Sequence, residues 1–129
     1  MSVTITFEEN PSVKLRNQPY ETIEVDLEKV LKSWKASLYS FEWLDQDGKI
    51  KPVAELKEAD QERRRQIEAR IEKGMPLEIP ILGIGMLDNV EIGVGKAVLL
   101  TAAALGTKTM PVHVASVHLD DFKAYIVAS

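Results

Sequence analysis

The composition of the chain changes sharply at Pro76, and this change constrains the fold more than any other feature. Residues 77–119 are mostly apolar and hold five of the seven glycines, whereas residues 53–73 are polar and helical in pattern. Short apolar runs bounded by glycine turns are typical of buried strands, and such strands need helices to cover them. We therefore expect an α+β fold, in which a mixed β-sheet packs against helices.

The chain begins with an arm and a strand. Residues 1–19 are predicted to form a loose N-terminal arm with one short strand at 3–7. The alternation of residues 20–25 then predicts a strand with Ile23 and Val25 facing inward.

The clearest helix follows at once. Apolar side chains at i, i+3, i+4, i+7 and i+11 predict a helix over 27–38, with Asp26 as its N-cap. The aromatic, alternating segment 39–44 predicts a short strand with Phe41 and Trp43 on one face. Three aromatic residues of this region are assigned to the core: Trp34, Phe41 and Trp43.

The second half supplies most of the expected sheet. The polar helix 53–73 is expected to break near Asp60 and to end at Gly74. The remaining expected elements are strands 79–82 and 90–92 with a turn at 87–89, helix 97–105, strand 110–115 and a short terminal helix begun by Asp120.

Length and composition place limits on the class of protein. The 129 residues predict one domain, divided into the arm 1–19, a strand-and-helix part 20–76 and an apolar part 77–129. The chain has no cysteine, which excludes disulfides and fits a cytoplasmic protein. No apolar run is long enough to span a membrane. The net charge of −4 disfavours nucleic acid as a partner.

The glycine-rich segment GVGKA at 93–97 has to be compared with the known phosphate-binding motifs. The string has features of a phosphate-binding loop, because glycines let the backbone approach an anion and a helix start attracts one. Its spacing departs from both known fingerprints. Val90 stands where a P-loop needs glycine, Ala97 replaces the magnesium-binding Ser or Thr, and Val98 replaces the third glycine of the dinucleotide motif. Hydrolysis of nucleoside triphosphates is therefore disfavoured.

A weaker anion or nucleotide site remains open at this turn. It would use the backbone of Gly93 and Gly95 together with the ammonium group of Lys96. The alternative is an ordinary turn from strand to helix with a solvated Lys96, and this alternative is favoured because helix N-termini are common features.

No catalytic residue or metal site is predicted. Glu91, close to the glycine turn, is the alternative candidate for acid–base chemistry, together with Asp88, but no spacing pairs them. His113 and His118 are the only histidines, and neither has the ligand spacing of a metal site. We assign both a structural or surface role.

The basic cluster Arg63-Arg64-Arg65 lies within the polar helix. Successive helical residues point to different faces, and Arg64 and Glu68 are spaced as an i, i+4 ion pair. The cluster is therefore interpreted as part of a solvated, charged helix face rather than as a nucleic-acid-binding site.

From residue 69 onward the chain resembles the core of the ParB/sulfiredoxin superfamily. In order along the chain, the matching features are Gly74 at a helix end, the strand Ile79-Pro80-Ile81-Leu82, Val90-Glu91-Ile92 before a turn, Gly95, Leu105-Gly106 closing a small-residue helix, and the strand Met110-Pro111-Val112-His113-Val114. Upstream, residues 23–27 resemble the first strand and helix start of the family. The resemblance covers about 75 residues and implies the same mixed-sheet scaffold.

The chain departs from the family at the phosphate-binding turn. Lys96, Ala97 and Val98 stand where the family usually has a basic run ending in arginine. In the family that arginine is a principal phosphate ligand, and valine cannot donate a hydrogen bond. The resemblance therefore implies a degenerate motif, whose single lysine is a point charge and a weak phosphate ligand.

These observations together predict a small, non-catalytic, regulatory or partner-binding protein without a cofactor. The alternative is a divergent nucleotide-binding or ParB-like nuclease protein, which would bind CTP or ATP weakly at residues 93–96. A third possibility is an interaction module of a mobile-element or toxin-neutralising system. The partner and the oligomeric state do not follow from the sequence.

Overall fold

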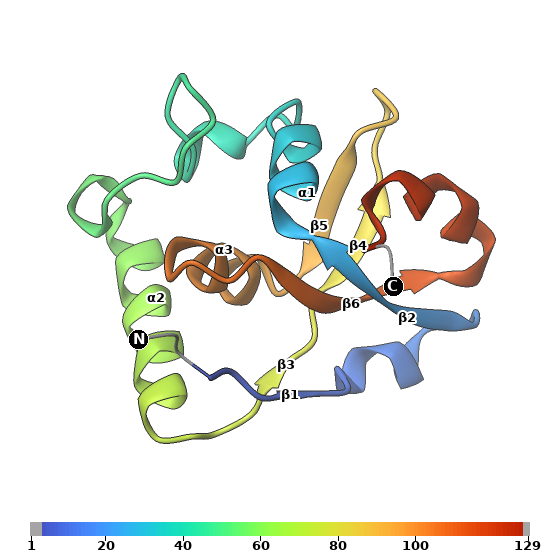
Figure 1. Cartoon of the computed structure of the whole chain (residues 1–129), viewed down its shortest axis with the longest axis horizontal. Coiled ribbons are helices and arrows are strands. Elements are labelled where there is room, and N and C mark those ends of the chain that lie inside the picture. Colours follow the sequence, from blue (N-terminus) through green and yellow to red (C-terminus); the bar gives the residue numbers. More distant parts are fainter. Residues whose placement is uncertain (1–3, 128–129) are drawn as a thin grey trace.

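A computed structural model describes residues 4–127 of the chain (Figure 1). Its strands are β1 (Phe7–Glu8), β2 (Tyr20–Asp26), β3 (Leu77–Glu78), β4 (Ile81–Ile84), β5 (Val90–Val94) and β6 (Thr109–Ala115). Its α-helices are α1 (Leu27–Trp34), α2 (Glu58–Glu72) and α3 (Lys96–Ala104). The 3-10 segments are η1 (Pro11–Leu15), η2 (Ser40–Glu42), η3 (Val53–Glu55) and η4 (Ser116–Tyr125).

The main sheet is mixed, and its strand order is β2-β6-β4-β5. β6 pairs antiparallel with β2 from Tyr20 opposite Ala115 to Asp26 opposite Thr109, and it runs parallel to β4. β4 and β5 form an antiparallel hairpin. A separate parallel pair joins β1 to β3. The expected α+β class with a mixed sheet is therefore confirmed.

The helices cover the sheet in layers. Figure 1 shows α3 lying between the sheet and α2, so that α3 is enclosed. Five consecutive residues of α3 are buried, from Val98 to Ala102, and Leu99 and Leu100 are completely inaccessible. This helix is thus buried on most sides, and its nearly uniform apolar composition follows from its position.

The N-cap of α1 and the turn before α3 follow from local chemistry. The Asp26 carboxylate accepts a hydrogen bond from the Lys29 N–H at 3.2 Å, which satisfies one free donor of α1. Gly95 precedes α3 with φ of +84°, a backbone conformation that is strained for any residue with a side chain. A Cβ on this glycine would lie 3.0 Å from the Cα of Pro80, so both backbone angle and space require glycine.

The segment after α1 differs from the expected structure. The helix ends at Trp34 rather than at residue 38. Just beyond this end, the Ser40 hydroxyl donates a hydrogen bond of 2.8 Å to the Lys35 carbonyl. Residues 40–42 form a 3-10 turn instead of a strand. Side chains therefore do not alternate. Trp43 is completely buried but Phe41 is 63% exposed, so the assignment of Phe41 to the core was wrong.

Three other boundaries also differ. The polar helix breaks at Leu56–Lys57 rather than at Asp60, because Leu56 is buried and the chain is extended on both residues. The strand expected at 79–82 begins at Ile81. The terminal segment is a 3-10 helix that begins at Ser116, before Asp120.

The N-terminal arm is docked rather than loose. Its strand is Phe7–Glu8, paired with Leu77–Glu78, and residue 3 of the expected strand lies outside the described residues. Asn10 is only 2% exposed and donates its side-chain amide to the carbonyl of Ile79 at 2.9 Å. In the part of the chain that the structure describes, no helix is long and apolar enough to cross a bilayer.

Candidate functional site

The glycine turn forms one wall of a groove of about 700 Å³. Gly93, Gly95 and Lys96 lie in this wall, as the sequence predicted, and the first half of α2 forms the wall opposite. Three charged residues lie in that wall: Lys57, which precedes α2, and Asp60 and Arg63 within it. The structure therefore brings the three predicted site residues together at the N-terminus of α3, beside two further cations.

A carboxylate of the chain already forms ion pairs with the two lysines of this groove. Glu42, which lies on η2, accepts a hydrogen bond from the Lys57 ammonium at 2.7 Å and lies 3.8 Å from the Lys96 ammonium. The bond to Lys57, with the nearby charges of Lys57, Lys96 and Lys51, holds the pKa of Glu42 below its ordinary value. Glu42 is therefore ionised at neutral pH, and it already supplies a counter-charge to both lysines.

Asp60 makes the groove still less suitable for phosphate. This residue is 5% exposed, and its Oδ2 atom has no hydrogen-bond partner among the described residues. A buried carboxylate repels a second anion and favours a ligand that can donate a hydrogen bond. The groove thus combines two lysines paired with Glu42, the exposed Arg63 and a carboxylate whose Oδ2 atom lacks a donor.

The position of Val98 is not available for a side chain that binds phosphate. It lies in the first turn of α3, borders the groove and is only 8% exposed, because it also packs into the hydrophobic core. An arginine at this position would bring its charge into that core.

Glu91 belongs to a different part of the molecule. Its Oε1 accepts the Ser37 hydroxyl at 2.6 Å, and its Oε2 accepts the Asn89 amide at 3.0 Å. Glu91 is therefore not brought together with Gly93, Gly95 and Lys96 as a candidate acid or base. Instead it joins the segment after α1 to the β4–β5 hairpin.

The two histidines have separate environments. His113 is 3% exposed on β6, where its Nε2 accepts the backbone N–H of Asn10 at 3.1 Å and its Nδ1 lies 2.9 Å from the Thr22 hydroxyl. His118 lies at the surface, 3.2 Å from an Asp121 carboxylate oxygen. A structural role for His113 is consistent with these contacts, and the described residues contain no group of three metal-ligating side chains.

Exposed apolar side chains gather at one end of the molecule, which we call the apolar end. It comprises five residues with 60–101% of their surface exposed: Leu38, Tyr39, Phe41, Met86 and Leu87. The first three follow α1 and the last two form the tip of the β4–β5 hairpin, and Figure 1 shows both segments at its upper edge. The Ser37–Glu91–Asn89 hydrogen bonds connect the two segments at their bases.

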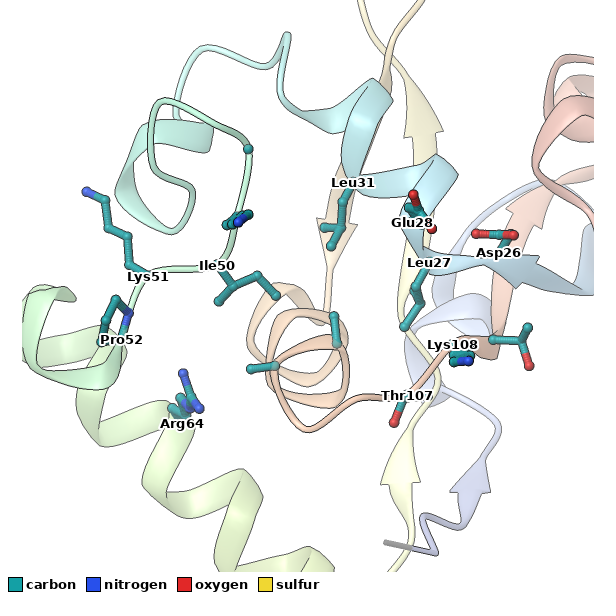
Figure 2. Close-up of a pocket in the computed structure, with 15 residues that line it drawn as sticks. Asp26, Leu27, Glu28, Leu31, Ile50, Lys51, Pro52, Arg64, Thr107 and Lys108 are labelled. Atoms are coloured by element: carbon teal, nitrogen blue, oxygen red, sulfur yellow. The ribbon is translucent and has the colours of Figure 1, made fainter. Parts of the chain in front are cut away.

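Sequence reasoning missed a second pocket, together with its one nearly buried cation. Figure 2 shows this pocket between the start of α1, residues 48–52, α2 and the end of α3. Arg64 lies on its α2 wall with only 11% of its side chain exposed, although it was assigned to a solvated face. A signal was present, because Arg64 shares the i, i+4, i+7, i+11 face of α2 with Asp60, Ile67 and Ile71.

Comparisons with known proteins add no relatives. The chain matches no protein-family model, no curated protein and no solved structure.

Proposed function

We propose that the protein is a regulatory or partner-binding module, and that it binds its protein partner through the apolar end. The observation that carries this proposal is the exposure of Leu38, Tyr39, Phe41, Met86 and Leu87 at one end of the molecule. Exposed apolar side chains that gather on one part of a surface mark protein–protein interfaces, and aromatic side chains and methionine are enriched in them. The partner would present an apolar surface of its own.

The structure of the two segments supports a preformed interface. Asn89 is buried at the base of the hairpin, and its amide also donates to the Val90 carbonyl at 3.0 Å. Ser33 accepts the Val90 N–H at 2.8 Å, which fixes α1 against the start of β5. The exposed side chains therefore project from a rigid base, so that binding requires little ordering of the backbone.

The nucleotide-binding alternative rests on Lys57, Lys96 and the N-terminus of α3, all of which border the groove. The position of Glu42 argues against it, because this carboxylate already pairs with both lysines. The ParB/sulfiredoxin resemblance and a cytoplasmic location remain predictions that fit the proposed module.

Site-specific photo-crosslinking in the native host tests the partner surface. A photoreactive residue replaces Phe41 in one variant, Met86 in a second and Val117, which is also exposed, in a control. We expect positions 41 and 86 to label the same protein and position 117 not to label it. The purified partner should then bind the native chain, and Phe41→Ser and Met86→Ser should each weaken binding by about tenfold or more.

Two results would contradict the partner proposal. Equal labelling from all three positions would show that the apolar end has no preference for a partner. Labelling of a second copy of the chain, with a concentration-dependent mass in light scattering, would replace the separate partner with self-association.

Thermal shift with CTP, ATP and ADP tests the alternative. The native protein should show no stabilisation at millimolar nucleotide, whereas Glu42→Gln should gain stabilisation because two lysines lose their internal counter-charge. A rise of several degrees in the native protein would favour the nucleotide-binding protein instead.

A further inference from the structure

The pocket in Figure 2 has the size and lining of a small-molecule site. Its volume is about 840 Å³, within the range of pockets that enclose drug-sized ligands. Leu27, Leu31, Ile50 and Ala103 line it, and all four pack in or against the hydrophobic core. A ligand in this pocket would therefore bury an apolar body against fixed side chains rather than against a mobile surface.

Arg64 gives this pocket a nearly buried charge. Among residues 4–127, the only carboxylate paired with its guanidinium is Glu68, whose Oε1 lies 3.7 Å from the Arg64 Nε, beyond hydrogen-bond distance. That Nε atom is buried and has no hydrogen-bond partner among the described residues. Because a buried guanidinium without full pairing is costly, an anion that pairs with Arg64 from the pocket would offset that cost.

The charges around the pocket are distributed unevenly. Lys49, Lys51 and Lys108 also line it, and none of the three forms an ion pair within residues 4–127. In Figure 2, Arg64 and Lys51 lie on one side of the pocket. Two carboxylates of the lining, Asp26 and Glu28, lie on the opposite side, together with Lys108.

We propose that this pocket binds a small monocarboxylic acid with an apolar body, whose carboxylate pairs with Arg64. The planar guanidinium can hold two carboxylate oxygens at once, and the neighbouring Lys51 adds attraction. The apolar part would lie between Leu31 and Ala103. A phosphate ester presents similar anionic chemistry to Arg64, and the titration below distinguishes it from a carboxylic acid. This inference is independent of the partner surface.

Calorimetric titration with matched probes tests the proposal. Octanoate and 4-phenylbutyrate represent the acid, and octanamide and 4-phenylbutyramide are uncharged controls of the same shape. We expect each acid to bind at least about tenfold more tightly than its amide, since the amide forms no charge-assisted pair with Arg64. Tighter binding of octyl phosphate than of octanoate would replace the carboxylic acid with a phosphate ester as the ligand.

Arginine variants then locate the carboxylate. Arg64→Gln should abolish the preference for acid over amide, whereas Arg63→Gln, which changes the exposed neighbouring residue, should leave it intact. Ala103→Leu fills the pocket from α3 and should weaken acid and amide alike. Circular dichroism and thermal melts establish that each variant is folded, and Ala103→Leu serves as the second test if Arg64→Gln does not fold.

Three outcomes would overturn the proposal. The first is that no probe binds at millimolar concentration. The second is that acid and amide bind the native protein equally, so that charge plays no part. The third is that folded Arg64→Gln keeps the preference for the acid, or that folded Ala103→Leu binds both probes as the native protein does. Any of these would show that the carboxylate does not bind in this pocket.

Discussion

At the scale of single residues, His113 connects the N-terminal arm to the sheet. Its Nε2 accepts the Asn10 N–H, which assigns the ring proton to Nδ1 and makes Thr22 the acceptor of that proton. A second proton on Nε2 would oppose the N–H of Asn10, donor against donor. Burial lowers the pKa of His113, and the charge of Glu9 opposes this shift.

The lowered pKa of His113 predicts that the attachment of the arm, and with it the fold, is less stable in mild acid. Below a pH of about 6.5 the unfolded chain binds a proton at residue 113 more readily than the folded chain does. The contribution of His113 to stability is thus fully present at neutral pH and is lost as the pH falls through the lower, folded pKa. Urea unfolding at about pH 7.5 and about pH 5 should therefore show a smaller pH-dependent loss for His113→Gln than for the native protein.

The surface histidine supplies the control for this experiment. His118→Gln changes an exposed residue and should leave the pH-dependence of the free energy of unfolding close to that of the native protein. An identical pH-dependence in His113→Gln and native protein would contradict the role given to the buried imidazole.

Gly95 allows a second test at the residue scale. Gly95→Ala should lower the free energy of unfolding by about 1–2 kcal/mol, because alanine strains the left-handed backbone and contacts Pro80. Gly83 is a matched control, since its φ is not in the positive range and nothing lies within 4 Å of an added Cβ. Denaturant melts of both variants measure the difference, and equal stabilities would show that the turn before α3 is not conformationally restricted.

At the scale of elements, α3 is the principal packing unit of the molecule. Leu100 is completely buried in it, so Leu100→Ala should lower the free energy of unfolding by about 2–5 kcal/mol. Ala104→Ser, at an exposed position of the same helix, should change it by less than about 0.5 kcal/mol. Urea denaturation measures both values. A loss under about 1 kcal/mol for Leu100→Ala would mean that α3 is not enclosed as described.

Elements set by local patterns could be predicted from the sequence. The N-cap at Asp26, the left-handed glycine at Gly74 and the turn at Asp88, whose φ is +58°, all follow from the chemistry of a few neighbouring residues. By contrast, the arm could not be placed, because Asn10 and His113 are 103 residues apart.

In the candidate sites, too, features set by neighbouring residues could be predicted and contacts between distant residues could not. The sequence placed Gly93, Gly95 and Lys96 together because they are contiguous. It could not show that Glu42 reaches Lys96 from another element, since that contact depends on how η2 packs. It also predicted an alternating strand at 39–44, and the 3-10 turn found there exposes Phe41.

At the scale of the whole molecule, charge and its arrangement determine the response to nucleic acid. The chain carries a net charge of −4, and within its one arginine cluster Arg64 faces a pocket while Arg65 pairs with Glu62 at 3.0 Å. We predict that the protein does not shift duplex or single-stranded DNA in a gel at physiological salt. Binding at micromolar protein that weakens as salt rises would contradict this prediction.

The central position of β6 also governs how the protein is made. Its seven residues pair with β2 on one side and β4 on the other, yet they are the last sheet strand to leave the ribosome. Until they emerge, both neighbouring strands have an unpaired edge, and pairing then has to close a loop of more than 80 residues between Asp26 and Thr109. The sheet of the nascent chain therefore assembles only after β6 has emerged, and until then those edges are open to pairing with other chains.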